Sequence, residues 1–335
     1  MSYDNGNNND IDKIKDKLLA EQDEDYNGNK KSKVDTTTTI QTLQQQRIWQ
    51  SFLIQNPDLI EFVVKIVQKT VKCENSLIRH IIYTGLSTYI PDKTTNLGIM
   101  APTSEGKTYV VTETLQYYPD GDIEYIGKMS TMALVRKKGI LIDKNGQPID
   151  KQLKELSKRK SLLGNKEEDR EEKSQINEEI IDLLEDAKTL IDLSGKILVF
   201  LEPPRPDLWD LLKPILSHDR KEIKFDFVNK TDKEGHQTKE VIVRGWPTCI
   251  FCSAKNESQW PIWPEIQSRF SIVSPNMVPE KYSASTELIS LKFGWPDSTQ
   301  QQVIISDSDI QLAKDCISLI KQRILKLQTR NKDGT

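Results

Sequence analysis

The sequence predicts an α/β protein with a parallel central sheet, and three short apolar segments carry this prediction. The first, Leu97–Met100, is followed by a turn-forming loop and then by Tyr109–Val111, which opens a helix. The second, Ile197–Leu201, is a compact run bounded by glycine and proline, and the third, Thr248–Ser253, follows the break Gly245-Trp246-Pro247. Strands that are covered on both faces of a parallel sheet have this almost continuous apolar character.

The composition restricts the class of protein. The chain has 335 residues, enough for one large or two ordinary domains, and its formal net charge of −3 argues against a general polyanion binder. No apolar run reaches the roughly 18 residues that span a bilayer. The four cysteines are too few and too scattered for a disulfide framework, and Met1–Asn29 has no apolar core of a signal peptide. We therefore expect a cytoplasmic protein without a membrane partner.

Four regions follow one another along the chain. Residues 1–38 are polar and poor in aromatics, so we expect a disordered tail. Residues 39–94 form a helical N-terminal segment, with apolar residues at helical spacing, that should pack on the next domain. Residues 95–280 form the α/β domain, and residues 281–335 form a partly helical C-terminal segment with a helix over Gln302–Gln328.

The loop after the first strand has the composition of a P-loop, with alanine where the common pattern begins with glycine. Its backbone N–H groups and the positive end of the following helix would form a cradle for a polyphosphate. Lys107 would reach the β- and γ-phosphates and the Thr108 hydroxyl would bind Mg²⁺. ATP and Mg²⁺ are therefore the expected ligands. The alternative is a chance match in a loop, which the strand before and the helix after it disfavour. The expected nucleotide-binding residues are Ala101, Pro102, Thr103, Ser104, Glu105, Gly106, Lys107 and Thr108.

Two insertions are expected in the domain. Residues 150–193 are rich in Lys, Glu and Leu and predict a charged helical hairpin that breaks at Gly164–Asn165 and ends before Gly195. This arm is either a solvated pair of helices or a partner-binding surface. Residues 223–243 predict a β-hairpin with a basic tip, whose expected nucleic-acid contacts are Lys230, Lys233 and Lys239.

Three further side chains are candidates for catalysis. Glu202 ends the second apolar run, where a carboxylate could complete the Mg²⁺ site, or could be an ordinary strand-end acid. Asn256, after the third run, could orient the attacking water, as could Ser253 or Lys255. Arg269 follows a short helix and could reach a neighbouring subunit's γ-phosphate or simply cap that helix.

The cysteines and histidines form no catalytic or metal-binding pattern. Cys249 and Cys252 lie in an expected strand and, three residues apart, should point to opposite faces. We expect them to be core residues. His80, His218 and His236 are isolated from one another in the sequence.

The order of these elements resembles the AAA+ type of P-loop ATPase, with Walker A, Walker B, a hairpin before the sensor strand, and Ser-Arg-Phe. The inserted hairpin is similar to that of the pre-sensor-1 group, which includes superfamily 3 and MCM helicases. Short stretches of the sequence also resemble ATPase modules associated with phage and plasmid primases. The resemblance covers about residues 75–275. The matching pieces are Ala101–Thr108, Tyr125–Ser130, Ile197–Glu202, Leu212–Ser217 and Ser268–Phe270.

The resemblance implies a P-loop three-layer sandwich and a role for each candidate. Lys107 and Thr108 would bind phosphate and Mg²⁺, Glu202 would serve the metal, Asn256 would be the sensor, and Arg269 the arginine finger. It also implies a homo-oligomer, as a ring, and a primase or other replication partner. Pro203 departs from the family because it stands where a second acid is usual, which leaves the catalytic base open.

The expected function is ATP hydrolysis coupled to unwinding or remodelling of DNA in replication. The alternative is a nucleotide-dependent regulatory or assembly factor that hydrolyses slowly and contacts protein through the charged arm. A nucleotide kinase is disfavoured, because no lid with substrate-binding arginines is apparent in the sequence.

Overall fold

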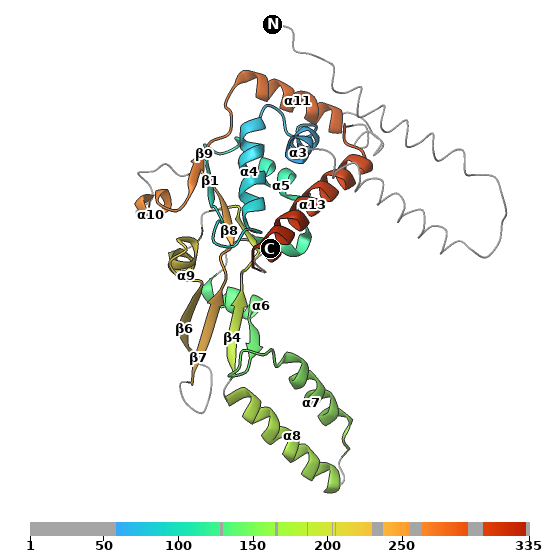
Figure 1. Ribbon diagram of the computed structural model, residues 1–335, viewed down its shortest axis with the longest axis vertical. Coiled ribbons are helices and arrows are strands. Elements are labelled where there is room, and N and C mark those ends of the chain that lie inside the picture. The colour runs from blue at the N-terminus through green and yellow to red at the C-terminus, as the bar shows by residue number, and fades with distance from the viewer. Residues whose placement is uncertain are drawn as a thin grey trace, which may run out of the picture. The chain divides into compact units, whose positions relative to one another are not determined.

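The computed structural model describes most of the chain after residue 57 (Figure 1). The described residues all belong to one compact unit, Pro57–Thr335. The expected disordered tail, residues 1–38, lies outside the described residues, and so does the segment 39–57. None of the described helices is long and apolar enough to cross a membrane. The described ranges are 58–127, 130–164, 167–185, 187–202, 204, 206–229, 237–254, 263–293 and 304–332.

A five-stranded sheet forms the centre of this unit, and all of its strand pairs are parallel. The strand order is β2-β5-β8-β1-β9. Both β5 and β8 are buried along their whole length, as their apolar sequences predict. The parallel central sheet is therefore confirmed. Its strands are β1 (Leu97–Met100), β2 (Ile123–Ile126), β5 (Ile197–Phe200), β8 (Thr248–Ser253) and β9 (Ser271–Val273).

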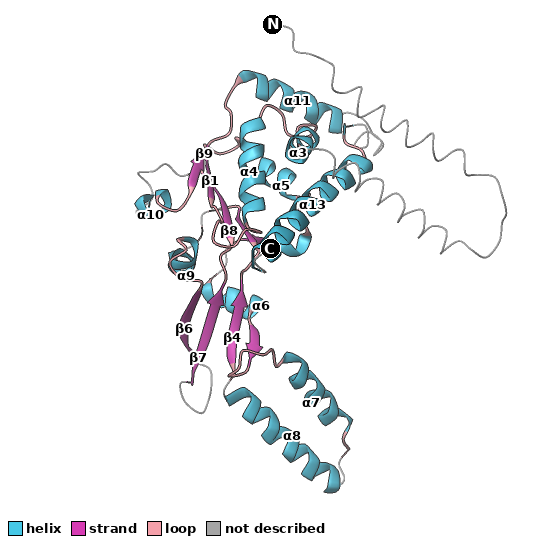
Figure 2. Ribbon diagram, in the orientation of Figure 1, coloured by secondary structure: helices cyan, strands magenta, loops and turns pink. Residues whose placement is uncertain are grey.

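Helices cover both faces of the sheet (Figure 2), an arrangement compatible with a three-layer α/β fold. On one face the Oγ of Ser87 lies 3.1 Å from the Oγ1 of Thr248. On the other face Phe251 packs edge-on against Phe270, at 5.0 Å between ring centroids. Side chains of β8 alternate between these two layers, as a strand requires. The first layer holds α3 (Leu59–Val67), α4 (Asn75–Ser87) and α5 (Lys107–Leu115), and the second holds α9 (Pro206–Leu216) and α10 (Trp263–Gln267).

Gly98 in β1 has no room for a side chain. A Cβ built on it would lie 2.6 Å from the ring of Phe251 and 2.7 Å from the Cδ1 of Ile272. These two side chains come from the strands on either side of β1. The absence of a side chain at Gly98 therefore leaves space for side chains of both neighbouring strands to pack over β1.

One buried amide connects the amino ends of β8 and β9 with the carboxyl end of α9. The Nδ2 of Asn96 donates to the carbonyls of Leu216 and Arg269, each at 3.2 Å. Its Oδ1 accepts from the N–H of Cys249 at 2.9 Å. Asn96 is only 4% exposed, so its amide supplies hydrogen bonds to these three backbone groups inside the core.

A second sheet has the order β3-β4-β7-β6 and was not predicted. The predicted β-hairpin is confirmed as the antiparallel pair β6 and β7. However, it does not stand alone, because β7 also pairs in parallel with β4, which pairs with β3. Val241 and Val243 of β7 pack in the same core cluster as Phe200 and Trp209. The strands are β3 (Ile140–Ile142), β4 (Lys188–Asp192), β6 (Glu222–Asn229) and β7 (Gln237–Arg244); helix α6 (Thr131–Lys138) contacts β4.

The charged arm consists of α7 (Asp150–Leu162) and α8 (Glu167–Glu185), which lie side by side beyond β3 and β4 (Figure 1). The prediction that the second helix continues to Gly195 was wrong. The helix ends at Glu185, and Lys188–Asp192 is strand β4. Pairing with β7 overrides the helical spacing of the apolar residues in this stretch, which contains β-branched residues that favour a strand.

The C-terminal segment contains α11 (Pro279–Phe293), which was not predicted, and α13 (Asp307–Lys332), which begins later than expected. Ser306 and Asp309 form a capping box at the start of α13, where each side chain accepts from the other's backbone N–H. Asp309 also pairs with Lys69 at 2.8 Å and so fixes α13 to the α3 region. Burial alone would raise the pKa of Asp309, but its bonds to Lys69 and Ser306 outweigh burial and lower the pKa to about 2.

Candidate functional site

The loop between β1 and α5 curls at the carboxyl edge of the central sheet. Ser104 and Gly106 both adopt left-handed backbone conformations, with φ of 67° and 76°. Only glycine adopts this conformation without strain, so Ser104 is held there by its surroundings. Left-handed residues at the start of a helix turn backbone N–H groups inward, and such concave loops bind anions. Gly106 is the N-cap of α5, which places the positive end of the helix at the same point.

Lys107 folds back over the loop and is only 8% exposed. Its Nζ donates to the carbonyl of Ala101 at 2.8 Å and to the carbonyl of Pro102 at 2.5 Å. A lysine ammonium has three donors, so this one keeps capacity for a further acceptor. The positive charge thus lies against the loop itself and not in bulk solvent.

Strands β8 and β9 flank the loop where it leaves β1. The N–H of Ala101 donates to the carbonyl of Ser253 at 3.2 Å, and the Oγ of Ser274 donates to the carbonyl of Met100 at 2.7 Å. Strand β8 is the parallel neighbour of β1 in the sheet. These bonds fix the start of the loop to both neighbouring strands.

Cys252 of β8 lies under the start of α5, a contact that the sequence did not predict. The Thr108 hydroxyl hydrogen-bonds to its sulfur. Burial raises the pKa of the Cys252 thiol to about 11, although the nearby charge of Lys107 and the bond from Thr108 oppose this rise. Cys249 is buried in the other layer, among the residues of the hydrophobic cluster around Trp209. Both cysteines are therefore core residues on opposite faces, as expected.

Glu202 lies at the same edge of the sheet as the loop. It follows β5 by two residues and is exposed. Phe200 of β5 pairs with Phe251 of β8, which pairs with Gly98 of β1, so β8 separates Glu202 from the loop. Two strand spacings are roughly 10 Å. Pro203, which follows Glu202, lies outside the described residues.

Arg269 lies at the opposite edge of the sheet. The next strand, β9, begins at Ser271 beside Leu97, the first residue of β1. The Nη1 of Arg269 donates to the carbonyl of Glu265 and to the Oγ of Ser268, each at 2.9 Å. Its buried Nε has no hydrogen-bond partner within the described part of the chain. In this chain, Arg269 therefore caps α10 and does not join the loop at the other edge.

The remaining candidates cannot be placed at the site. Asn256 and Lys255, and the hairpin residues Lys230 and Lys233, lie outside the described residues. The backbone of Lys239 pairs with Phe227 in the β6–β7 ladder. Over the described ranges, no group of three or more His, Cys, Asp and Glu side chains is arranged to hold a metal ion.

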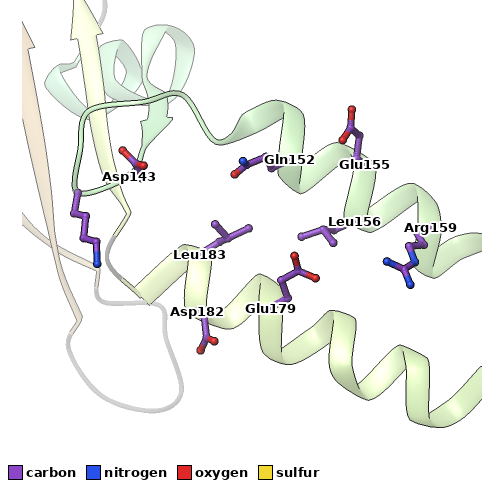
Figure 3. A pocket seen from close by; sticks show the side chains of 9 residues that line it. Asp143, Gln152, Glu155, Leu156, Arg159, Glu179, Asp182 and Leu183 are labelled. Carbon is purple, nitrogen blue, oxygen red and sulfur yellow. The ribbon is translucent and has the colours of Figure 1, made fainter.

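A cavity of about 600 Å³ opens between α7 and α8, away from the loop (Figure 3). Leu156 and Leu183 lie on its two sides, with Glu155, Glu179 and Asp182 around them. The two helices are joined by the pair of Arg159 with Glu172, at 2.6 Å. The cavity therefore belongs to the charged arm.

Sequence reasoning missed three residues that support the loop, namely Glu74, Lys281 and Tyr282. Lys281 and Tyr282 both contact Glu105. No sequence motif marks these residues, because each is a common side chain in an unremarkable local context and they meet only through the tertiary fold.

Comparison with known proteins gives no further assignment: no protein-family model matches the chain, and no curated protein matches it.

Proposed function

We propose that loop 101–108 binds the triphosphate of ATP together with Mg²⁺, and that the protein hydrolyses this ATP. The observation that carries the proposal is the loop itself. Ser104 and Gly106 are left-handed, α5 begins at Lys107, and the Lys107 ammonium lies against the loop carbonyls. Ligands of open α/β sheets bind at the carboxyl ends of the strands, where this loop lies.

The residues present suit this ligand. Inward N–H groups and the helix end would bind phosphate oxygens, and Lys107 would exchange its carbonyl partners for the β- and γ-phosphates. Mg²⁺ prefers hard oxygen ligands, which the Thr108 hydroxyl and the Glu202 carboxylate would supply directly or through water. When bound, the ion would neutralise charge on the phosphates. Thr108 would give up its bond to Cys252 for this role.

Hydrolysis is tested by Glu202→Gln. We expect the variant to hydrolyse ATP about 100-fold more slowly, because a carboxylate that serves as base or holds the metal contributes on the order of 10²–10⁴ in rate. Its affinity for ATP should change only a few-fold. Turnover is measured by phosphate release with excess Mg²⁺. Asp210→Asn, an exposed acid of α9, is the matched control and should behave as wild type. Wild-type turnover in Glu202→Gln would contradict the role of Glu202.

We further propose that ATP turnover is coupled to DNA, in an AAA+-type homo-oligomer. This rests on the order of the loop, Glu202, the β6–β7 hairpin and Arg269, and on the lysines of the hairpin, of which Lys230 and Lys233 lie between the two strands in the sequence and Lys239 lies in β7. In such an assembly Arg269, at the edge opposite its own loop, would face the loop of a neighbouring subunit.

Substitution of Lys230, Lys233 and Lys239 by glutamine tests this coupling. Each lost phosphate contact lowers the salt slope of single-strand binding by about 0.7, so we expect the slope to fall by about 2. Stimulation of ATP turnover by single-stranded DNA should disappear, while turnover without DNA should stay the same. Lys154, Lys158 and Lys160 of α7, replaced likewise, provide the charge-matched control. A triple variant that is still stimulated by DNA would contradict the hairpin contact.

The second candidate function is a nucleotide-dependent regulator that acts on protein. The observation that favours it is the arm, where Leu162, Ile181 and Leu184 are exposed, the last two one helical turn apart on α8. Exposed apolar side chains that lie next to one another are typical of protein-binding surfaces. ATP binding with negligible turnover and no salt-sensitive DNA affinity would support this function over the first.

A further inference from the structure

Lys281, near the start of α11, is a buried lysine with three partners. It is 6% exposed, and its Nζ lies 2.6 Å from Oε1 of Glu74. It also donates to the carbonyl of Asn276 at 2.9 Å and to the carbonyl of Glu105 at 3.1 Å. All three donors of the ammonium can be used in this way. Lys281 therefore connects α11 to the residue between the two left-handed positions of the loop.

The partner carboxylate is equally enclosed. Glu74, the N-cap of α4, is 1% exposed, and each of its oxygens accepts from the N–H of Asn276 at 3.1 Å. A buried ion pair is tolerated only when both charges are fully hydrogen-bonded, and removal of one partner leaves the other uncompensated. The ion pair with Glu74 therefore fixes the position of the Lys281 ammonium, and with it the carbonyl of Glu105 that Lys281 binds.

A second residue of α11 holds the same loop residue from outside. Tyr282 is 45% exposed, and its Oη donates to Oε2 of Glu105 at 2.8 Å. Lys281 binds the backbone of Glu105 and Tyr282 binds its side chain. Two neighbouring residues of α11 therefore fix the tip of the loop between Ser104 and Gly106.

We propose that Lys281 and Tyr282 are positioning residues of the nucleotide site, and that docking of α11 sets the affinity of the loop for ATP. The proposal rests on the proposed function of that loop. When the two contacts are lost, the loop populates its phosphate-binding shape for a smaller fraction of the time, and the apparent Kd rises by the inverse of that fraction. The coupling is reciprocal, so bound ATP should in turn hold α11 in place.

The test compares the full chain with Lys281→Met, Tyr282→Phe and the double variant Glu74→Gln/Lys281→Met, which removes both buried charges. We expect the Kd for Mg-ATP to rise about tenfold in both variants at Lys281 and about threefold in Tyr282→Phe. KM should rise in parallel while kcat changes less than about twofold, because neither side chain would touch the phosphates. Lys314→Met, at an exposed position of α13, removes the same charge and should bind as wild type.

Hydrogen exchange distinguishes a positioning role of Lys281 from a purely structural one, because a purely structural role would not make the exchange of α11 depend on ATP. ATP should slow exchange of the α11 amides in the wild type and not in Lys281→Met. Wild-type Kd values in both Lys281→Met and Tyr282→Phe would overturn the proposal. If Lys281→Met does not fold, the double variant and the half-exposed Tyr282→Phe decide the question. A wild-type protein that binds no ATP would instead overturn the proposed function.

Discussion

Lys107→Ala is expected to weaken the binding of Mg-ATP by about 100-fold, or about 2.8 kcal/mol. The Lys107 ammonium lies on the loop that would hold the phosphates, where it is 8% exposed and bonded to loop carbonyls. Charge-assisted bonds to phosphate contribute about 1.5–3 kcal/mol each. Alanine removes this charge and leaves the phosphates to the backbone amides, the helix end and the Mg²⁺ ion. Binding is measured by titration calorimetry and turnover by phosphate release.

The same variant should remain folded, because both acceptors of Lys107 are loop carbonyls at the carboxyl edge, next to solvent. Pro102 is exposed and Ala101 is half-buried, so water can replace the lost donor there. The thermal midpoint without nucleotide should therefore fall by only a few degrees, while stabilisation by Mg-ATP disappears. Lys93→Ala, at an exposed position before β1, is the matched control. Unchanged ATP binding in Lys107→Ala would refute the nucleotide-site assignment.

The core strands of the central sheet could be predicted because their signal is local. Leu97–Met100, Ile197–Phe200 and Thr248–Ser253 are apolar on both faces and bounded by turn residues. The loop between β1 and α5 could be predicted for a similar reason, since Gly106 and the strand–loop–helix order are visible in sequence. Such features need no knowledge of distant residues.

The second sheet and the loop supports could not be predicted, because they depend on long-range contacts. Lys188–Asp192 carries apolar residues that continue the helical spacing of α8, and only its pairing with β7 makes it a strand. Glu74 and Lys281 are far apart in sequence and become partners only when α4 and α11 meet at the loop. A contact between two side chains that are far apart in the chain leaves no periodic pattern in the sequence.

Asn96→Leu is expected to lower the free energy of unfolding by about 3–5 kcal/mol, a large part of the roughly 5–15 kcal/mol that stabilises a domain. Leucine has a similar shape but neither donates nor accepts. The carbonyls of Leu216 and Arg269 and the N–H of Cys249 would lose their bonds to residue 96. Each buried group left unpaired costs about 1–3 kcal/mol. Urea unfolding measures the loss, and Asn177→Leu on the exposed face of α8 should change stability by less than about 0.5 kcal/mol.

The loss should appear in stability and not in ligand affinity. Asn96 precedes β1 at the amino edge of the sheet, whereas the loop follows β1 at the carboxyl edge. Asn96→Leu molecules that remain folded should therefore bind Mg-ATP with a Kd within about threefold of wild type. A stable Asn96→Leu protein would mean that water replaces all three bonds at the amino edge. A destabilised protein with a much weaker Kd would mean that β1 transmits strain from Asn96 to the loop, because interiors packed to crystal density deform as units.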